Sequence, residues 1–193
     1  MKTVQMTRAE IDTRLARFDA LQSMSTMKDN EKVSQEAKDL IFARKIMPIV
    51  LEQTQNPFGN VAAIFGAHGL TMNVSVCPAG QGPGLHVHHE TYETFFVLEG
   101  SFEFEVNDRG EEKVVLNKWD TLSVPPGVAR GFRNVADRDS VLLTVITGGV
   151  KDRNDVSLPP IMAERLEAAQ PGIVPEFEAI GLSFDAGRES ARP

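Results

Sequence analysis

The feature that most constrains the fold is a series of short β-type segments between residues 60 and 149. The segments are rich in Val, Phe, Thr and Ile, and clusters of Gly, Pro, Asn and Asp separate them. This sequence pattern is typical of an all-β barrel or sandwich. The connections are too short to hold helices, so we expect mostly antiparallel strands. The predicted strands cover residues 61–65, 70–76, 85–88, 93–98, 101–106, 113–116, 121–124, 129–134 and 141–147.

The segment before the β-region has helical signals. Thr7 and Glu10 form a capping box, which predicts a helix over residues 7–20. Its apolar residues recur at helical spacing on one face: Ile11, Leu15 and Phe18. Ser34 is suited to cap a second helix that leads toward Pro48. These helices are expected to pack on the barrel or on a partner chain.

The segment after the β-region loses the alternation of strands. Residues 162–169 predict one short C-terminal helix after a loop that contains Pro159 and Pro160. The expected organisation is an N-terminal helical extension over 1–59, a β-barrel over 60–149 and a C-terminal extension over 150–193 that packs on the barrel. A chain of 193 residues is long enough for one such domain.

Composition and charge exclude several classes of partner. The net charge is −7 and the 20 Lys and Arg are scattered, so we expect no binding to nucleic acid or to a membrane surface. Cys77 is the only cysteine, which excludes an internal disulfide. The N-terminal residues lack the apolar core of a secretory signal, and no apolar run is long enough to span a bilayer. We therefore expect a cytoplasmic protein.

Two histidines and a glutamate carry the clearest chemical signal. His86 and His88 are separated by one residue in a predicted strand, so their side chains share one face. Glu93 opens the next predicted strand after a turn and can bring a carboxylate alongside both rings. Two imidazoles and one carboxylate form the facial set that leaves open positions on Fe(II) and similar ions. The three residues are therefore candidate metal ligands.

At this point the sequence resembles the cupin family. The first cupin motif is a glycine, five residues, His-x-His, four residues, a glutamate, six residues and a glycine. The chain matches it at Gly80, His86, His88, Glu93 and Gly100.

The second cupin motif is matched only in part. It asks for a glycine, five residues, Pro-x-Gly, two residues, a histidine, three residues and an asparagine. Pro125, Gly127 and Asn134 match, whereas Trp119 stands in place of the first glycine and Arg130 in place of the histidine. Asn117 and Asp120 can supply turn-forming hydrogen bonds around Trp119.

The resemblance implies a fold and a set of expectations. The fold would be an antiparallel double-stranded β-helix, the jelly-roll barrel of cupins, with helices at its N-terminal side and a short one at its C-terminal side. The resemblance also implies a homodimer, for which the face of Ile11, Leu15 and Phe18 offers apolar surface. The cofactor would be a divalent metal ion, Fe, Mn, Zn or Ni, and the ligand a small molecule.

Arg130 leaves two functions open. In the first, the protein resembles cupin oxygenases of the dioxygenase or oxidoreductase class: His86, His88 and Glu93 hold the metal, and Arg130 clamps the anionic group of a small oxygenated or aromatic acid. In the second, Arg130 and Glu93 form an ion pair in a metal-free cupin of the small-molecule-binding or isomerase type. A guanidinium stays protonated and cannot itself be a metal ligand.

Overall fold

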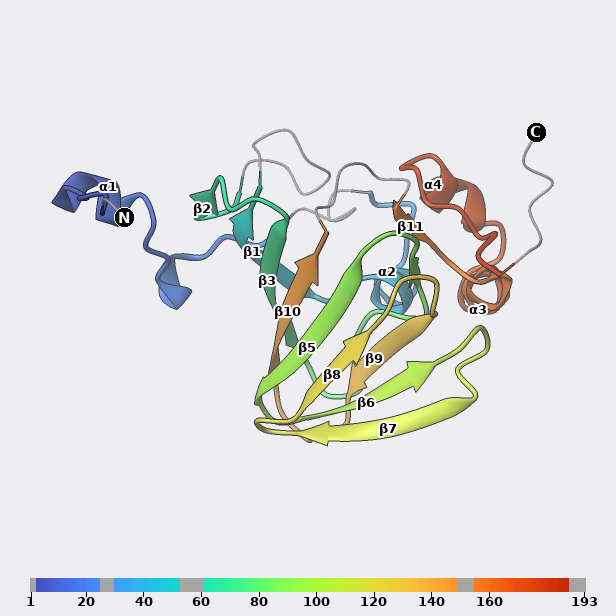
Figure 1. The fold of residues 1–193 in the computed structure, drawn as a ribbon. Coiled ribbons are helices and arrows are strands. Elements are labelled where there is room, and N and C mark those ends of the chain that lie inside the picture. The colour runs from blue at the N-terminus through green and yellow to red at the C-terminus, as the bar shows by residue number, and fades with distance from the viewer. Residues whose placement is uncertain (1–2, 25–29, 53–60, 149–154, 188–193) are drawn as a thin grey trace.

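Two sheets face each other to form the body of the protein in the computed structural model (Figure 1). The structure describes residues 3–24, 30–52, 61–148 and 155–187. The larger sheet has the order β2-β1-β3-β10-β5-β8, formed by β1 Lys45–Leu51, β2 Ile64–Phe65, β3 Leu70–Cys77, β5 Tyr92–Glu99, β8 Thr121–Val124 and β10 Ser140–Thr147. The smaller sheet has the order β7-β6-β9, formed by β6 Ser101–Val106, β7 Glu112–Asn117 and β9 Arg130–Asn134. A separate pair joins β4 Val87–His88 to β11 Val156–Ser157. The predicted all-β fold with short helices is confirmed.

An aromatic core fills the space between the two sheets. The Phe95 ring from β5 lies 4.8 Å from the Phe104 ring of β6 and 5.5 Å from the Phe132 ring of β9, measured between centroids. Phe102 packs edge-on against Phe132 at 5.7 Å. Aromatic pairs at these distances stabilise a core beyond the area that they bury. The contact between the sheets therefore rests on residues of β5, β6 and β9.

Strand alternation places one charged residue on the inner face of β5. Glu93, Phe95 and Val97 are all buried, and they alternate with the less buried Thr94 and Phe96. Side chains two residues apart in a strand point to the same side. Glu93 thus lies on the core side, at the end of the row that Phe95 and Val97 continue.

The sheet begins earlier in the chain than the sequence predicts. Ser34 caps helix α2 as expected, with its Oγ accepting a hydrogen bond from the Ala37 amide, but α2 spans only Gln35–Ile41. The chain then forms β1, which pairs with β3, so part of the expected helical extension over 1–59 belongs to the barrel. Pro48 lacks an N–H for the strand ladder, and the pairing register shifts between Pro48 and Val50. Pairing with β3 overrides the helical signal there.

The N-terminal segment also differs from its prediction. The capping box of Thr7 and Glu10 is present, but α1 covers only Arg8–Asp12, and a 3₁₀-helix η1 follows at Phe18–Ala20. Neither helix has a buried residue, and the segment stands away from the barrel in Figure 1. Short helices need tertiary packing to persist in water. The N-terminal helix has no such packing within one chain, so it is short. The predicted helix over residues 7–20 is therefore wrong in its length.

Helices from both ends of the chain form a second hydrophobic cluster beside the sheets. The predicted C-terminal helix is present as α3 Pro160–Ala169, and the sequence missed both the shorter α4 Val174–Glu178 and β11. The cluster joins α2, α3 and α4 to the segment before β4: Val33, Ala37, Ile41, Leu85, Leu158, Met162, Leu166, Ile173, Phe177 and Phe184. None of the helices in the described ranges has the length and hydrophobicity that a membrane-crossing helix needs.

Trp119 occupies a backbone conformation that favours glycine. Its φ is +77°, in the turn closed by the hydrogen bond from the Asp120 amide to the Asn117 carbonyl. Asp120 also accepts a hydrogen bond from the Asn117 amide at 2.8 Å, as the sequence suggests for this turn. A left-handed conformation disfavours any residue with a Cβ atom. The indole ring gains contacts in return, because Phe96 lies 5.8 Å away and Lys118 lies over its face.

We expect Trp119→Gly to be more stable than Trp119→Ala by about 1 kcal/mol, because both variants lose the ring contacts and only glycine relieves the positive φ. Chemical denaturation measures the two free energies of unfolding. Lys118 provides the control, because it is not among the residues of the described chain that have a positive φ. At that position we expect Lys118→Ala to be more stable than Lys118→Gly. Equal stabilities of the two Trp119 variants would contradict a strained turn.

The homodimer remains a prediction, and the N-terminal segment shows how to test it. Ile11, Leu15 and Phe18 are 47%, 41% and 54% exposed in one chain, so they offer apolar area to a second copy. We expect a dimer by light scattering at micromolar concentration, and a shift toward monomer in Leu15→Lys. Asp19→Lys adds a lysine to a polar position of the same segment and should leave the mass unchanged. A monomeric wild type would exclude the dimer.

Candidate functional site

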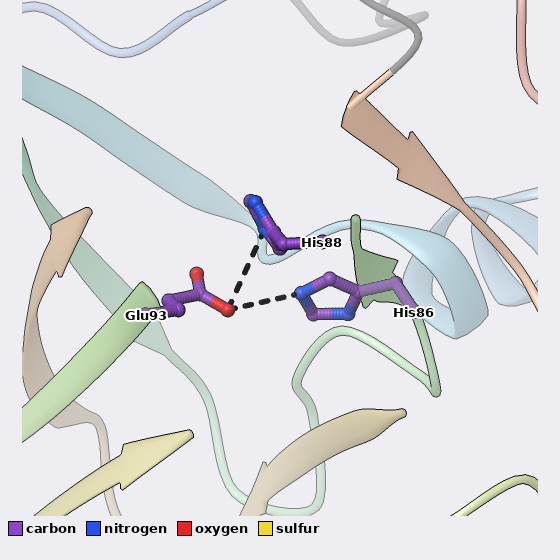
Figure 2. A group of neighbouring side chains, drawn as sticks. All are labelled: His86, His88 and Glu93. Atoms are coloured by element: carbon purple, nitrogen blue, oxygen red, sulfur yellow. Dashed lines mark hydrogen bonds and ion pairs between the residues drawn. The ribbon is translucent and has the colours of Figure 1, made fainter. Parts of the chain in front are cut away.

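The two histidines and the glutamate meet at one point inside the barrel. His86 and His88 flank Val87 at β4, and Glu93 comes from the start of β5. Nε2 of His86 lies 3.3 Å and Nε2 of His88 3.6 Å from the same oxygen, Oε2 of Glu93 (Figure 2). One ligand atom from each residue lies within 4.8 Å of the others, close enough to hold one metal ion. The expected juxtaposition of these side chains is therefore present.

The outer nitrogens of both rings face hydrogen-bond acceptors. Nδ1 of His86 lies 2.9 Å from the Gly84 carbonyl oxygen, and Nδ1 of His88 lies 2.9 Å from the Asp155 carboxylate. A carbonyl or a carboxylate can only accept, and each Nδ1 lies closer to its acceptor than the Nε2 of the same ring lies to Glu93, which favours the hydrogen on Nδ1. In the neutral rings both Nε2 atoms then offer lone pairs toward the centre. Histidines that ligate metals are held in this way, so the donor set fits a divalent cation.

Glu93 is a buried carboxylate surrounded by positive partners. Burial alone would raise its pKa, but His88, His86 and Arg130 outweigh burial and lower the pKa to about 2. Its charge is thus retained at any pH near neutrality. Two imidazole lone pairs beside a carboxylate oxygen would repel it, so the centre needs a positive charge, which Arg130, bound protons or a metal ion can supply.

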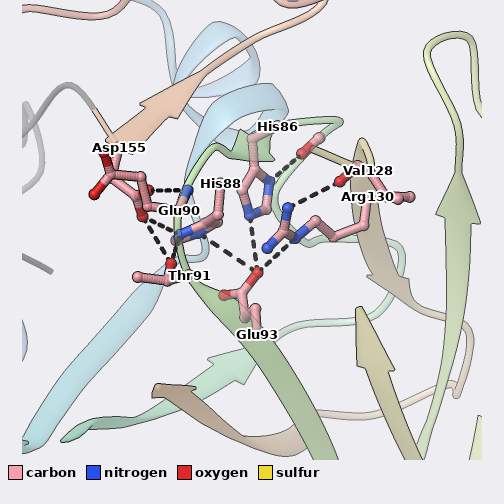
Figure 3. A network of polar contacts seen from close by, with 9 residues as sticks. His86, His88, Glu90, Thr91, Glu93, Val128, Arg130 and Asp155 are labelled. Carbon is pink, nitrogen blue, oxygen red and sulfur yellow. Dashed lines mark hydrogen bonds and ion pairs between the residues drawn. The ribbon is translucent and has the colours of Figure 1, made fainter. Parts of the chain in front are cut away.

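Arg130 lies in the same centre and is completely buried. Its Nε donates to Oε2 of Glu93 at 2.9 Å and its Nη1 donates to the Val128 carbonyl at 2.9 Å. Burial lowers the pKa of this guanidinium, and the Glu93 charge opposes that effect. Its Nη2 is buried and has no hydrogen-bond partner among the residues that the structure describes. Figure 3 shows the guanidinium beside the contact between His86 and Glu93.

Backbone contact between β9 and the segment before β4 sets the position of Arg130. The Arg130 and His86 backbones exchange two hydrogen bonds, at 2.8 and 2.9 Å. A Cβ atom on Gly131 would lie 2.7 Å from the Gly84 carbonyl carbon and 2.8 Å from the Leu85 amide nitrogen. Only glycine permits this close approach. The pairing of Arg130 with His86 therefore depends on Gly131.

Asp155 is a residue of the site that the sequence analysis missed. It directly precedes β11, is 7% exposed, and accepts hydrogen bonds from the Thr91 hydroxyl at 2.7 Å and the Glu90 amide at 2.7 Å (Figure 3). Burial alone would raise its pKa, but the bonds from His88, Thr91 and Glu90 hold that pKa below its ordinary range. Asp155 lies 67 residues after His88 in the chain, so no local sequence pattern indicates that the two side chains meet.

A cavity of about 180 Å³ opens beside the centre. His86, His88 and Glu93 form part of its wall, and Asn73 and Thr144 add polar groups from β3 and β10. The remaining wall is mostly apolar and comes from both extensions as well as the barrel: Ile41, Phe42, Ile46, Phe132, Ile146, Val156, Leu158 and Leu182. Apolar walls with a few polar groups are typical of sites for small molecules.

Residues 73–146, which run from within β3 to near the end of β10 and contain the first motif and the partial second motif, match the family model of the cupin domain. This part of the chain is a cupin domain. Of the residues in the centre, His86, His88, Glu93 and Arg130 lie inside the matched region, whereas Asp155 lies beyond it. The cupin domain thus carries the candidate ligands, and the C-terminal segment adds a carboxylate behind His88.

Several solved structures resemble this cupin at low sequence identity. A predicted oxalate decarboxylase from Thermotoga maritima is 20% identical with a TM-score of 0.42, over 53% of this chain and 80% of that one. KdgF from a Halomonas species is 19% identical with a TM-score of 0.39, over 53% and 79% of the two chains. A protein from Bacillus halodurans is 17% identical with a TM-score of 0.41, over 44% of this chain and 66% of that one, which is less than two thirds of its length. No protein of curated function matches the chain.

We expect Glu93→Gln to lower the free energy of unfolding by about 3 to 5 kcal/mol, because it leaves the buried Arg130 charge without a counterion. The pKa of about 2, below the ordinary 4.5, means that the Glu93 contribution is complete above pH 4.5 and is lost as the pH falls through 2. Denaturation in the presence of a chelator, from pH 7 to pH 2, should therefore show a steeper loss for wild type than for Glu93→Gln.

Glu99→Gln is the matched control for this experiment. Glu99 is an exposed carboxylate that pairs with Lys118 and Arg138 at the surface. Loss of an exposed ion pair costs up to about 1 kcal/mol. A Glu93→Gln variant no less stable than Glu99→Gln would contradict the central role of the buried pair.

Proposed function

We propose that this cupin is a metal-dependent enzyme of the oxygenase type that acts on a small oxygenated or aromatic acid. The observation that carries the proposal is the convergence of two imidazole Nε2 atoms on the Glu93 carboxylate, at 3.3 and 3.6 Å. The hydrogens on the two Nδ1 atoms leave both Nε2 lone pairs for a cation. His86, His88 and Glu93 would hold a divalent ion, Fe, Mn, Zn or Ni.

The bound ion would supply open coordination positions for small oxygenated molecules, as the two-histidine, one-carboxylate set does. The chain's own residues do the rest of the binding. Asn73 and Thr144 offer polar groups inside the cavity, and its apolar walls exclude water from a small aromatic or aliphatic body. Glu93 stays ionised because of its lowered pKa, so it keeps its charge for the cation near neutral pH.

Arg130 is the proposed clamp for the acidic group of the substrate. Its Nη2 is a buried donor with no acceptor in the described part of the chain, which is unfavourable for a charged group. An oxyanion of the substrate would satisfy this donor with a charge-assisted hydrogen bond. Because the guanidinium is fully buried behind Glu93, we expect Glu93 and Arg130 to shift when an acid binds.

A second candidate function is favoured by the contact between Arg130 and Glu93. The guanidinium Nε lies 2.9 Å from Oε2, the carboxylate oxygen that both histidines also approach. A guanidinium in this position supplies the positive charge that the centre needs, and it repels a divalent ion. The protein would then be a metal-free cupin that binds, or isomerises, a small molecule in the same cavity.

Metal content decides between the two functions. We expect untagged wild-type protein to contain close to one divalent ion per chain by elemental analysis, and to rebind Fe(II), Mn(II), Zn(II) or Ni(II) in calorimetric titration after chelation. His86→Ala should weaken that binding at least about tenfold, because it removes one of three ligands. His68→Ala, which removes an exposed histidine far from the cavity wall, should leave it unchanged.

Variants of Arg130 test the clamp separately. Under the first function, Arg130→Ala should retain metal and bind small carboxylic acids more weakly. Under the second, wild type should bind no divalent ion, and Arg130→His should gain binding by restoring the ligand that the second cupin motif contains. Equal metal affinity of wild type and Arg130→His would show that Arg130 does not control the metal site.

A further inference from the structure

Asp155 makes the closest carboxylate contact to His88, although it comes from a segment beyond the matched cupin domain. Its Oδ2 lies 2.9 Å from Nδ1 of His88, on the side of the ring opposite to Glu93 (Figure 3). Its Oδ1 accepts the Glu90 amide at 2.7 Å, and its backbone carbonyl accepts the His89 amide at 2.8 Å. The carboxylate is therefore held in place from several directions.

Both groups around Nδ1 of His88 act as acceptors. The Thr91 hydroxyl donates its hydrogen to Oδ2 of Asp155 at 2.7 Å, so it offers only lone pairs to Nδ1, which lies 2.9 Å away. The carboxylate can only accept. A neutral His88 ring has one hydrogen for two carboxylates, and Asp155 lies closer to Nδ1, at 2.9 Å, than Glu93 lies to Nε2, at 3.6 Å. The shorter contact places the hydrogen on Nδ1 and leaves the lone pair on Nε2.

We propose that Asp155 is a positioning residue that fixes the Nδ1–H tautomer of His88 and aims its Nε2 lone pair at the site shared with His86 and Glu93. The tautomer follows from the hydrogen bond between Asp155 and Nδ1, which is shorter than the contact between Nε2 and Glu93. Its consequence for metal affinity rests on the proposed function. The C-terminal segment would thus complete a site whose other members all lie in the cupin domain.

An Asp155→Asn variant should reverse the tautomer. The side chain must keep an oxygen toward the Glu90 N–H, so its amide NH₂ group would face His88. A donor opposite Nδ1 favours the tautomer that carries its hydrogen on Nε2. That ring has no lone pair for a cation at the centre, although its shape and packing are almost unchanged.

Nitrogen-15 NMR of the metal-free protein at neutral pH reads the tautomer directly. We expect His88 to carry its hydrogen on Nδ1 in wild type and on Nε2 in Asp155→Asn. Ser157→Ala is the matched control, because Ser157 lies on the same strand β11 and contacts a different imidazole, that of His89, at 2.7 Å. The His88 tautomer should be unchanged in that control.

Calorimetric titration with Zn²⁺ measures how the tautomer affects the affinity for a metal ion. Loss of a carboxylate behind a histidine ligand typically weakens metal binding about 10- to 100-fold, and we expect this range for Asp155→Asn. Ser157→Ala should bind Zn²⁺ as wild type does. Circular dichroism melting curves of the variants establish that they are folded.

The outcomes separate this inference from the proposed function. If wild type binds no Zn²⁺ but Asp155→Asn still reverses the tautomer, the metal function fails and the positioning role stands. If wild-type His88 carries its hydrogen on Nε2, or if Asp155→Asn leaves the tautomer unchanged, the positioning role is wrong. If Asp155→Asn does not fold, the test uses wild type and Thr91→Val, which keeps Asp155. We expect His88 to carry its hydrogen on Nδ1 in both proteins.

Discussion

The contact between Glu93 and Arg130 is the interaction on which the rest of the site depends. Both side chains are buried, and one carboxylate oxygen is approached by the guanidinium at 2.9 Å and by both imidazoles. A buried pair of charges is costly to desolvate and is stable only when hydrogen bonds satisfy it. Glu93 comes from the larger sheet and Arg130 from the smaller one, so the pair links the two sheets next to their aromatic core.

The same contact controls how the centre can be used. A cation held by His86, His88 and Glu93 must share Glu93 with Arg130, whereas without a cation Arg130 supplies the balancing charge itself. Nη2 of Arg130 has no acceptor among the described residues, so it is a buried donor that remains free for a ligand or a water molecule. Arginine in place of the histidine of the second motif thus puts a fixed positive charge beside Glu93.

The chain outside the cupin domain is part of the cavity. Ile41 and Phe42, at the end of α2, cover one side, and Leu158 and Leu182 from the C-terminal segment cover another. Asp155 belongs to the same C-terminal segment and holds His88 through Nδ1. A barrel alone would leave this side of the cavity open. The extensions therefore shape this cavity, and β11 pairs with β4, the strand that contains His88.

The sequence by itself determined the strands from β3 to β10, the shared face of His86 and His88, and the departure at Arg130, because period-two alternation and motif spacing are local properties. Only the tertiary structure decided that residues 45–51 form a strand and that the N-terminal helix ends at Asp12, since pairing partners and packing override local propensity. It also decided that Asp155 reaches His88 across 67 residues of chain. A contact between distant segments depends on how the whole chain folds, and no local pattern encodes it.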